Sequence, residues 1–185
     1  MSNDLQTQLA ASESLTAKFP GATITEAVQP VSSEDFRLQK EKHLSRNAEG
    51  GAIGILETPD NRIVLTKRSG MHAGWSLPGG TVETGEDFQE AYEREIFEEI
   101  GVKAQNTRLM LLEKKEFISP ENEKLHFLLA VFVSSISETT LPPKTPDAIA
   151  EGLDVEFFKP TDLPEKMILG DKAKVDFYVQ KFCLG

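Results

Sequence analysis

The stretch that most constrains this chain spans residues 79–102, where a glycine-rich turn runs directly into an acidic helical pattern. The pattern begins near Asp87 and stops at Gly101, a residue type that commonly ends helices. Apolar residues recur along it at helical spacing and predict one packing stripe: Phe88, Tyr92, Ile96 and Ile100. The carboxylates of Glu95, Glu98 and Glu99 fall within an arc of about 100° on the adjacent face. The sequence therefore predicts a helix that packs on one side and gathers negative charge on the other.

The clustered carboxylates of this helix repel one another. Like charges one turn apart destabilise a helix by roughly a few tenths of a kcal/mol per pair and raise each other's pKa values. A hard divalent cation would remove that cost, because it prefers carboxylate and carbonyl oxygens, so Mg²⁺ is the first expected partner and Mn²⁺ the alternative. A solvated acidic helix is the competing interpretation. The Pro-Gly-Gly entry at residues 78–80, Arg94 inside the acidic run and the Gly101 stop favour the cation site.

The spacing within this stretch follows the pattern G-x5-E-x7-R-E-U-x-E-E-x-G-U, in which U is an aliphatic residue. Every specified position is filled, by Gly80, Glu86, Arg94, Glu95, Ile96, Glu98, Glu99, Gly101 and Val102. The pattern resembles the box of the Nudix hydrolase family. The resemblance implies a Nudix-type α/β/α sandwich with a mixed β-sheet and a metal-dependent hydrolysis of phosphoanhydride bonds.

The same resemblance implies roles for individual residues. Glu95, Glu98 and Glu99 would be metal ligands, with the backbone carbonyl of Gly80 completing part of the shell. Glu98 is the favoured acceptor of the proton of the attacking water, although ligand and base roles are exchangeable among the three carboxylates. Together with Glu95 and Arg94 it makes up the predicted catalytic set.

Supporting residues are expected around these ligands. The planar guanidinium of Arg94 can fix a neighbouring carboxylate, with Glu86 as the expected partner across the loop. The alternative is an ordinary helix-surface pair of Arg94 with Glu90 or Glu98. A further carboxylate from outside the helix often joins such sites, and the candidates, in order, are Glu151 and Glu116.

Candidates for substrate contact lie just before the glycines. Trp75 either stacks on a base or fills the core. Lys67, Arg68 and His72 are placed to contact substrate phosphates, or else are simply solvated.

The composition limits the range of partners. The chain has 185 residues, which favours one domain, and its net charge of −10 speaks against nucleic acid, because no excess of Lys and Arg faces a phosphate backbone. One cysteine, Cys183, allows no internal disulfide. The first twenty residues lack signal-peptide character, and the longest apolar run, 127–133, is too short to span a membrane. The expectation is a soluble, cytoplasmic protein.

Hydrophobic patterning predicts the remaining elements. We expect an N-terminal extension over residues 1–47, which could serve as a dimerisation arm for a homodimer, and a Nudix domain over residues 48–185. In the extension, the patterns predict a weak helix before Pro20 and strands at 22–28 and 36–40. In the domain, they predict strands at 52–56, 62–66, 108–118, 125–136 and 153–158, and helices at 147–150 and 171–182, besides the acidic helix.

The leading functional interpretation is a Mg²⁺-dependent pyrophosphohydrolase that cuts a nucleoside diphosphate linked to another group. ADP-ribose or coenzyme A pyrophosphatases are alternatives. An ADP-ribose pyrophosphatase is expected to have a proline beyond the box, and in this chain Glu116 and Phe117 occupy that place. For a coenzyme A pyrophosphatase, the spacing between the upstream residues and the box is too short. A non-catalytic nucleotide sensor and an RNA-decapping hydrolase are further rivals; the intact box disfavours the first and the acidity disfavours the second.

Overall fold

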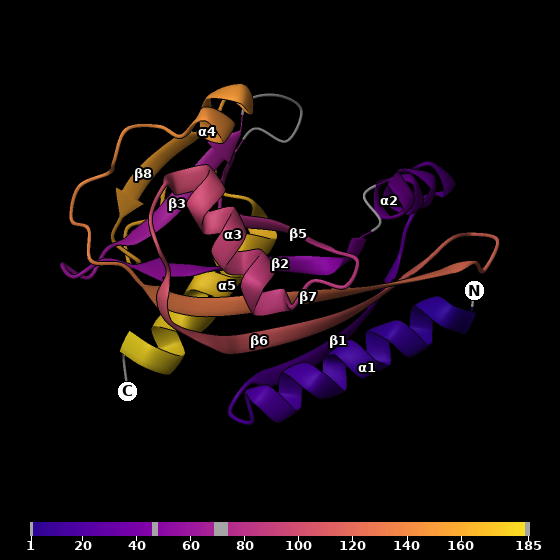
Figure 1. Cartoon of the computed structure of the whole chain (residues 1–185). Coiled ribbons are helices and arrows are strands. Elements are labelled where there is room, and N and C mark those ends of the chain that lie inside the picture. Colours follow the sequence, from indigo (N-terminus) through magenta and orange to yellow (C-terminus); the bar gives the residue numbers. More distant parts are fainter. Residues whose placement is uncertain (1, 46–47, 69–73, 184–185) are drawn as a thin grey trace. The chain divides into compact units, whose positions relative to one another are not determined.

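The computed structural model describes residues 2–45, 48–68 and 74–183, and Figure 1 labels most of its helices and strands. In chain order these are α1 (Ser2–Lys18), β1 (Thr23–Pro30), α2 (Ser33–Ser45), β2 (Ala48–Glu57), β3 (Ile63–Arg68), β4 (Gly74–Ser76), β5 (Gly79–Glu83), α3 (Phe88–Ile100), β6 (Gln105–Ile118), β7 (Lys124–Ser135), α4 (Pro146–Ala150), β8 (Asp154–Phe158), α5 (Leu169–Tyr178) and a π-helical turn (Val179–Cys183). The predicted mixed α/β architecture is confirmed.

The chain forms two compact units. The first comprises Met1–Ile53, Gly80–Tyr92 and Arg108–Phe132, and the second comprises Gly54–Gly79, Glu93–Thr107 and Val133–Gly185. The N-terminal segment thus shares a unit with strands from the middle of the chain. The expectation of one domain, drawn from the chain length, did not include this division.

In the first unit, the hydrogen-bonded strand order is β1-β6-β7-β2, and β5 also pairs with β2. Strand β1 runs parallel to β6 in a register from Thr23↔Leu111 to Pro30↔Ile118. Leu15 of α1 is buried, and the ring of Phe19 meets that of Phe132 edge-on with centroids 6.0 Å apart. Helix α1 and strand β1 are therefore packed into this unit.

The predicted strand at residues 36–40 is wrong, because these residues belong to helix α2. The Ser32 hydroxyl caps the first turn: it accepts a hydrogen bond from the Asp35 backbone N–H (3.1 Å) and donates one to the Asp35 carboxylate (2.7 Å). Arg37 and Glu41 form an i,i+4 ion pair at 2.7 Å, and Phe36 supplies the buried apolar contact. Capping and i,i+4 pairing together favour a helix over the short apolar alternation that suggested a strand.

In the second unit, the order is β2-β3-β4, and β8 pairs antiparallel with β3. The predicted hairpin is confirmed by the pairing Glu57↔Ile63, with Asn61 in the left-handed region (φ 60°) at its turn. The predicted C-terminal helix divides into α5 and the π-helical turn that follows it.

Helix α3 matches the prediction closely. All four residues of the expected stripe are buried, with exposed fractions of 0–4%: Phe88, Tyr92, Ile96 and Ile100. Gly101 ends the helix at φ +82°, a conformation that residues with a Cβ rarely adopt, and its N–H donates to the Phe97 carbonyl. The buried stripe fixes the rotation of α3 and so determines where its carboxylates lie.

Candidate metal and catalytic site

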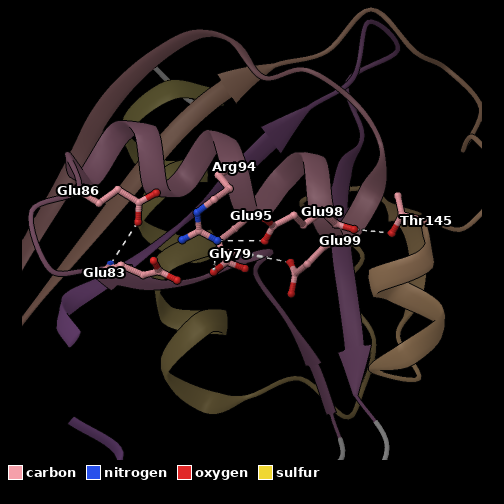
Figure 2. A network of polar contacts seen from close by, with 8 residues as sticks. All are labelled: Gly79, Glu83, Glu86, Arg94, Glu95, Glu98, Glu99 and Thr145. Atoms are coloured by element: carbon pink, nitrogen blue, oxygen red, sulfur yellow. Dashed lines mark hydrogen bonds and ion pairs between the residues drawn. The ribbon is translucent and has the colours of Figure 1, made fainter. Parts of the chain in front are cut away.

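Glu99 connects helix α3 to the glycine-rich turn. Its side chain is buried (4% exposed), and its carboxylate accepts a hydrogen bond from the Gly79 backbone N–H at 2.9 Å (Figure 2). Gly79 has φ +126°, which a residue with a Cβ would adopt only under strain. A buried carboxylate is stabilised by such a donor, so the contact holds Glu99 and the turn in one arrangement.

Arg94 bridges the other two carboxylates of the predicted set. Its Nη1 donates to Glu95 at 3.1 Å and to Glu98 at 3.0 Å, and the three side chains lie together on one side of α3 (Figure 2). The pair with Glu98 is the helix-surface contact that stood as the alternative for Arg94. Glu86, in the first unit, accepts a hydrogen bond from the Glu83 backbone N–H at 3.1 Å, and its pairing with Arg94 stays a prediction.

The pKa of Glu95 is shifted by burial and by the charges of its neighbours. Burial raises the pKa of Glu95 above its ordinary value, and the charges of Glu98 and Glu151 raise it further, while Arg94 opposes both effects. Glu151, the predicted fourth carboxylate, lies far from Glu95 in the sequence, but its charge still contributes to raising the pKa of Glu95. Burial is the largest of these effects on the pKa of Glu95, and the charge and hydrogen bond of Arg94 oppose it more than the two carboxylates add to it.

Thr145 is a residue of this region that the sequence interpretation missed. Its hydroxyl donates to the backbone carbonyl of Glu98 and accepts from the N–H of Ala148, so that it caps α4 while holding the last turn of α3 (Figure 2). The Thr-Pro pair before a short helical run, with Thr145 at N-cap and Pro146 at N1, was a readable capping signal. Its contact with Glu98 was not readable from the sequence.

Residues 49–178 match the sequence model of the NUDIX domain, which is more than half of the chain. The chain belongs to the NUDIX family. The family resemblance inferred from the box is therefore confirmed.

Several NUDIX relatives align with parts of the chain. An ADP-ribose pyrophosphatase of Methanocaldococcus jannaschii is 32% identical over 127 residues, covering 67% of this chain and 69% of that protein. An 8-oxo-dGTP diphosphatase of Escherichia coli (strain K12) is 36% identical over 73 residues, 38% of this chain and 55% of that protein. An RNA pyrophosphohydrolase of Aeromonas hydrophila is 39% identical over 51 residues, 28% of this chain and 29% of that protein. The chain thus spans from under a third to about two thirds of the length of these relatives.

A crystal structure of a mutator MutT protein from Bacillus halodurans superposes with a TM-score of 0.54 at 23% identity, covering 68% of this chain and 78% of that one. This similarity supports the NUDIX fold. Within the described ranges, none of the helices combines the length and apolar character needed to pass through a bilayer.

NUDIX hydrolases generally use divalent metal ions, and the donor set on α3 suits such an ion. Among the described residues, no three acidic, histidine or cysteine side chains are grouped so that they could hold a metal ion. Arg94 contacts Glu95 and Glu98, and the Gly79 N–H contacts Glu99. The residues still fit a cation chemically. All three supply oxygen donors, and burial disfavours the ionised form of Glu95, a cost that a bound divalent ion would offset.

Two predicted substrate contacts lie side by side in the second unit of the NUDIX chain. The Lys67 ammonium is 5.7 Å from the centroid of the Trp75 ring, which meets Phe158 edge-on with centroids 4.9 Å apart. Trp75 is half-buried, so one part of its ring packs while another stays accessible. Both of its proposed roles, packing and base stacking, are compatible with this position.

The remaining predicted site residues divide into three groups. Gly80 begins the part of β5 that belongs to the first unit. Glu116 pairs with Lys124 at 3.0 Å and with His126 at 3.7 Å, also in the first unit, and the choice between Glu151 and Glu116 as the fourth carboxylate stays a prediction. Arg68 ends β3, but its side chain lies outside the described residues, as does the whole of His72.

Proposed function

We propose that this chain is a pyrophosphohydrolase that uses a divalent cation, Mg²⁺ or Mn²⁺, to cut the phosphoanhydride bond of a nucleoside diphosphate linked to another group. The observation that carries the proposal is the grouping of Glu95 and Glu98 around the Arg94 guanidinium on α3, with the buried Glu99 of the same helix held to the glycine-rich turn. Membership of the NUDIX family supports the reaction class.

Each residue of the site has a proposed part in the reaction. Glu95, Glu98 and Glu99 would hold the cation, with Glu151 as a further oxygen donor. The cation, when bound, supplies positive charge against the diphosphate oxygens. Glu98, whose side chain is 40% exposed, would accept the proton of an attacking water. Arg94 positions Glu95 and Glu98 through the two contacts at its Nη1.

The substrate is the open part of the proposal, and the relatives suggest which compounds to test. An assay panel would contain ADP-ribose, 8-oxo-dGTP, coenzyme A, ordinary nucleoside triphosphates and 5′-triphosphorylated RNA, each with Mg²⁺ and with Mn²⁺. The products identify the bond that is cut. We expect a small nucleotide to be preferred over RNA, because the net charge of −10 repels a polyanion.

Substitution of Glu98 tests the catalytic proposal directly. Glu98→Gln should lower turnover of the best substrate by about 100-fold or more, because the proton acceptor and a ligand charge are lost together. Glu90→Gln is the matched control: it lies on the first turn of the same helix, is exposed, and should leave turnover unchanged. Undiminished hydrolysis by Glu98→Gln would contradict the proposed chemistry. Nucleotide binding without turnover in the unsubstituted protein would instead identify a sensor.

A further inference from the structure

We propose that the cavity between α1 and the sheet of the first unit binds a small uncharged molecule that has an apolar ring and one carboxamide-like group. The described residues that line this cavity belong to α1, β1, β6 and β7, whereas the proposed metal ligands Glu95, Glu98 and Glu99 belong to α3. The inference therefore concerns a second site and goes beyond the proposed hydrolysis.

The size of the cavity suits a small molecule. Its volume is about 280 Å³, and its described lining residues all lie in the first unit. Helix α1, which runs beside β1 (Figure 1), supplies one wall, and the three strands supply the other. Small-molecule sites in proteins typically have volumes of about 300–1,000 Å³, so this cavity can take a molecule of one or two fused rings.

The walls of the cavity contain large apolar side chains that are exposed. Leu9 of α1 is 47% exposed and Val28 of β1 is 64% exposed, and both line the cavity. Leu128 of β7 also lines it and is 3% exposed. Covering apolar surface is favourable, so a ligand with an apolar body would be stabilised by contact with Leu9 and Val28.

The charged side chains that line the cavity are already paired. The pairs are Glu26–Lys114 (3.8 Å), Lys115–Glu113 (3.2 Å), Glu116–Lys124 (3.0 Å) and Glu116–His126 (3.7 Å). A charged ligand would have to compete with one of these pairs while losing its own hydration. The balance of charge in the wall therefore favours a ligand without net charge.

Helix α1 supplies the uncharged polar groups of the cavity. Gln8 and Ser12 lie one turn apart on α1, are 5% and 3% exposed, and both line the cavity. The Gln side chain presents both a hydrogen-bond acceptor and donors, and the Ser hydroxyl can act as either. A carboxamide on the ligand also has an acceptor and donors, so it can pair with Gln8 in both directions.

A cavity that is only a gap in the packing makes a different prediction. Such a gap would take any apolar ring that fits, whatever polar group the ring carries. A site with the proposed selectivity would distinguish molecules that share one ring and differ only in the charge of the attached group.

The test uses the full chain, without nucleotide or metal, and three probes that share a naphthalene ring. These are 2-naphthamide, which is uncharged, the anion 2-naphthoate and the cation 2-naphthylmethylammonium. Two-dimensional NMR of the backbone amides measures the affinity and locates the probe. We expect 2-naphthamide to shift the signals of the lining residues and to bind about tenfold more tightly than either charged probe. Gln8→Leu should weaken 2-naphthamide binding by about fivefold or more, because the hydrogen bonds to the carboxamide are lost.

A matched pair of variants tests the location of the site. Val28→Trp fills the cavity from an exposed position and should abolish 2-naphthamide binding. Ile24→Trp is the control: Ile24 lies on the same face of β1, is 47% exposed and is not among the described lining residues, so binding should be unchanged.

Three results would overturn the inference: equal affinity for all three probes, amide shifts confined to other parts of the chain, or undiminished 2-naphthamide binding by folded Val28→Trp. If Val28→Trp does not fold, the shifts and the probe selectivity of the unsubstituted protein decide the question. These measurements involve no hydrolysis, so their failure leaves the proposed function standing, and the Glu98→Gln assay tests that function separately.

Discussion

At the scale of single residues, Glu99 shows what distinguishes the members of the acidic cluster. Helical spacing alone predicted that its carboxylate shares a face of α3 with those of Glu95 and Glu98. It could not show that Glu99 is the buried one or that its partner is the Gly79 N–H, since that contact depends on how the turn folds back onto the helix.

Removal of the Glu99 side chain should destabilise the protein. Glu99→Ala leaves the Gly79 N–H without this acceptor and opens space in a buried position, so the free energy of unfolding should fall by about 1–3 kcal/mol. Urea unfolding of the metal-free protein measures this, with the exposed Glu90→Ala as control. Equal stability of the two variants would show that the hydrogen bond contributes nothing.

Tyr178 provides a residue-scale prediction away from the site. Burial raises the pKa of its phenol, and the 2.6 Å hydrogen bond to the Glu57 carboxylate raises it further. Because the folded-state pKa is the higher one, the stabilisation is complete below about pH 10, the ordinary tyrosine pKa, and is lost as the pH rises above it. Tyr178→Phe should lower stability at neutral pH by about 1 kcal/mol and reduce the alkaline loss. Unfolding measured between pH 7 and 11 checks both effects, and an unchanged alkaline slope would contradict this account.

At the scale of elements, most of the fold could be predicted because strands and helices carry strong local patterns. The stripe of α3 and the hairpin of β2 and β3 are clear cases. Helix α2 was missed although its signal was present: Ser32 and Asp35 are spaced as a helix cap, and the strand interpretation gave more weight to a few apolar residues. Helix α4 was predicted, but its role in holding Glu98 requires knowledge of tertiary packing.

Two glycines with similar backbone conformations offer an element-scale comparison. A Cβ added at Gly85 (φ +80°) would meet nothing within 4 Å, whereas one added at Gly101 (φ +82°) would lie 3.1 Å from the Thr145 methyl carbon. Gly85→Ala should cost about 1–2 kcal/mol from backbone strain alone. Gly101→Ala should cost more and should also disturb the end of α3. Chemical denaturation of both variants tests this, and equal losses would mean that the Thr145 contact is easily relaxed.

At the scale of the whole molecule, the family match begins at residue 49, and the proposed boundary between extension and domain lies at residues 47–48. The compact units do not follow that boundary, because Met1–Ile53 belongs with Gly80–Tyr92 and Arg108–Phe132. Sequence patterns describe neighbours along the chain, so they could not reveal that β1 pairs with β6. The homodimer and the role of the extension as a dimerisation arm stay predictions.

The fragment 48–185 should therefore be less stable than the full chain. It lacks the β1 partner of β6 and the Phe19 ring that contacts Phe132, so apolar surface and an unpaired strand edge become exposed. Leu15→Ala in the full chain tests the same packing more gently and should cost about 2–5 kcal/mol. Thermal unfolding compares the three proteins. Identical unfolding temperatures for the fragment and the full chain would identify the extension as a detachable arm.

The contacts of Arg94 with Glu95 and Glu98 have a consequence for folding in the absence of metal. Its guanidinium already offsets part of the charge of Glu95 and Glu98, so we expect the acidic end of α3 to fold without a bound cation. An excess of a chelator such as EDTA should then leave the unfolding temperature within about 2 °C of that in plain buffer, whereas a structural metal would be lost together with the fold. The proposed cation would then be needed for activity but not for folding.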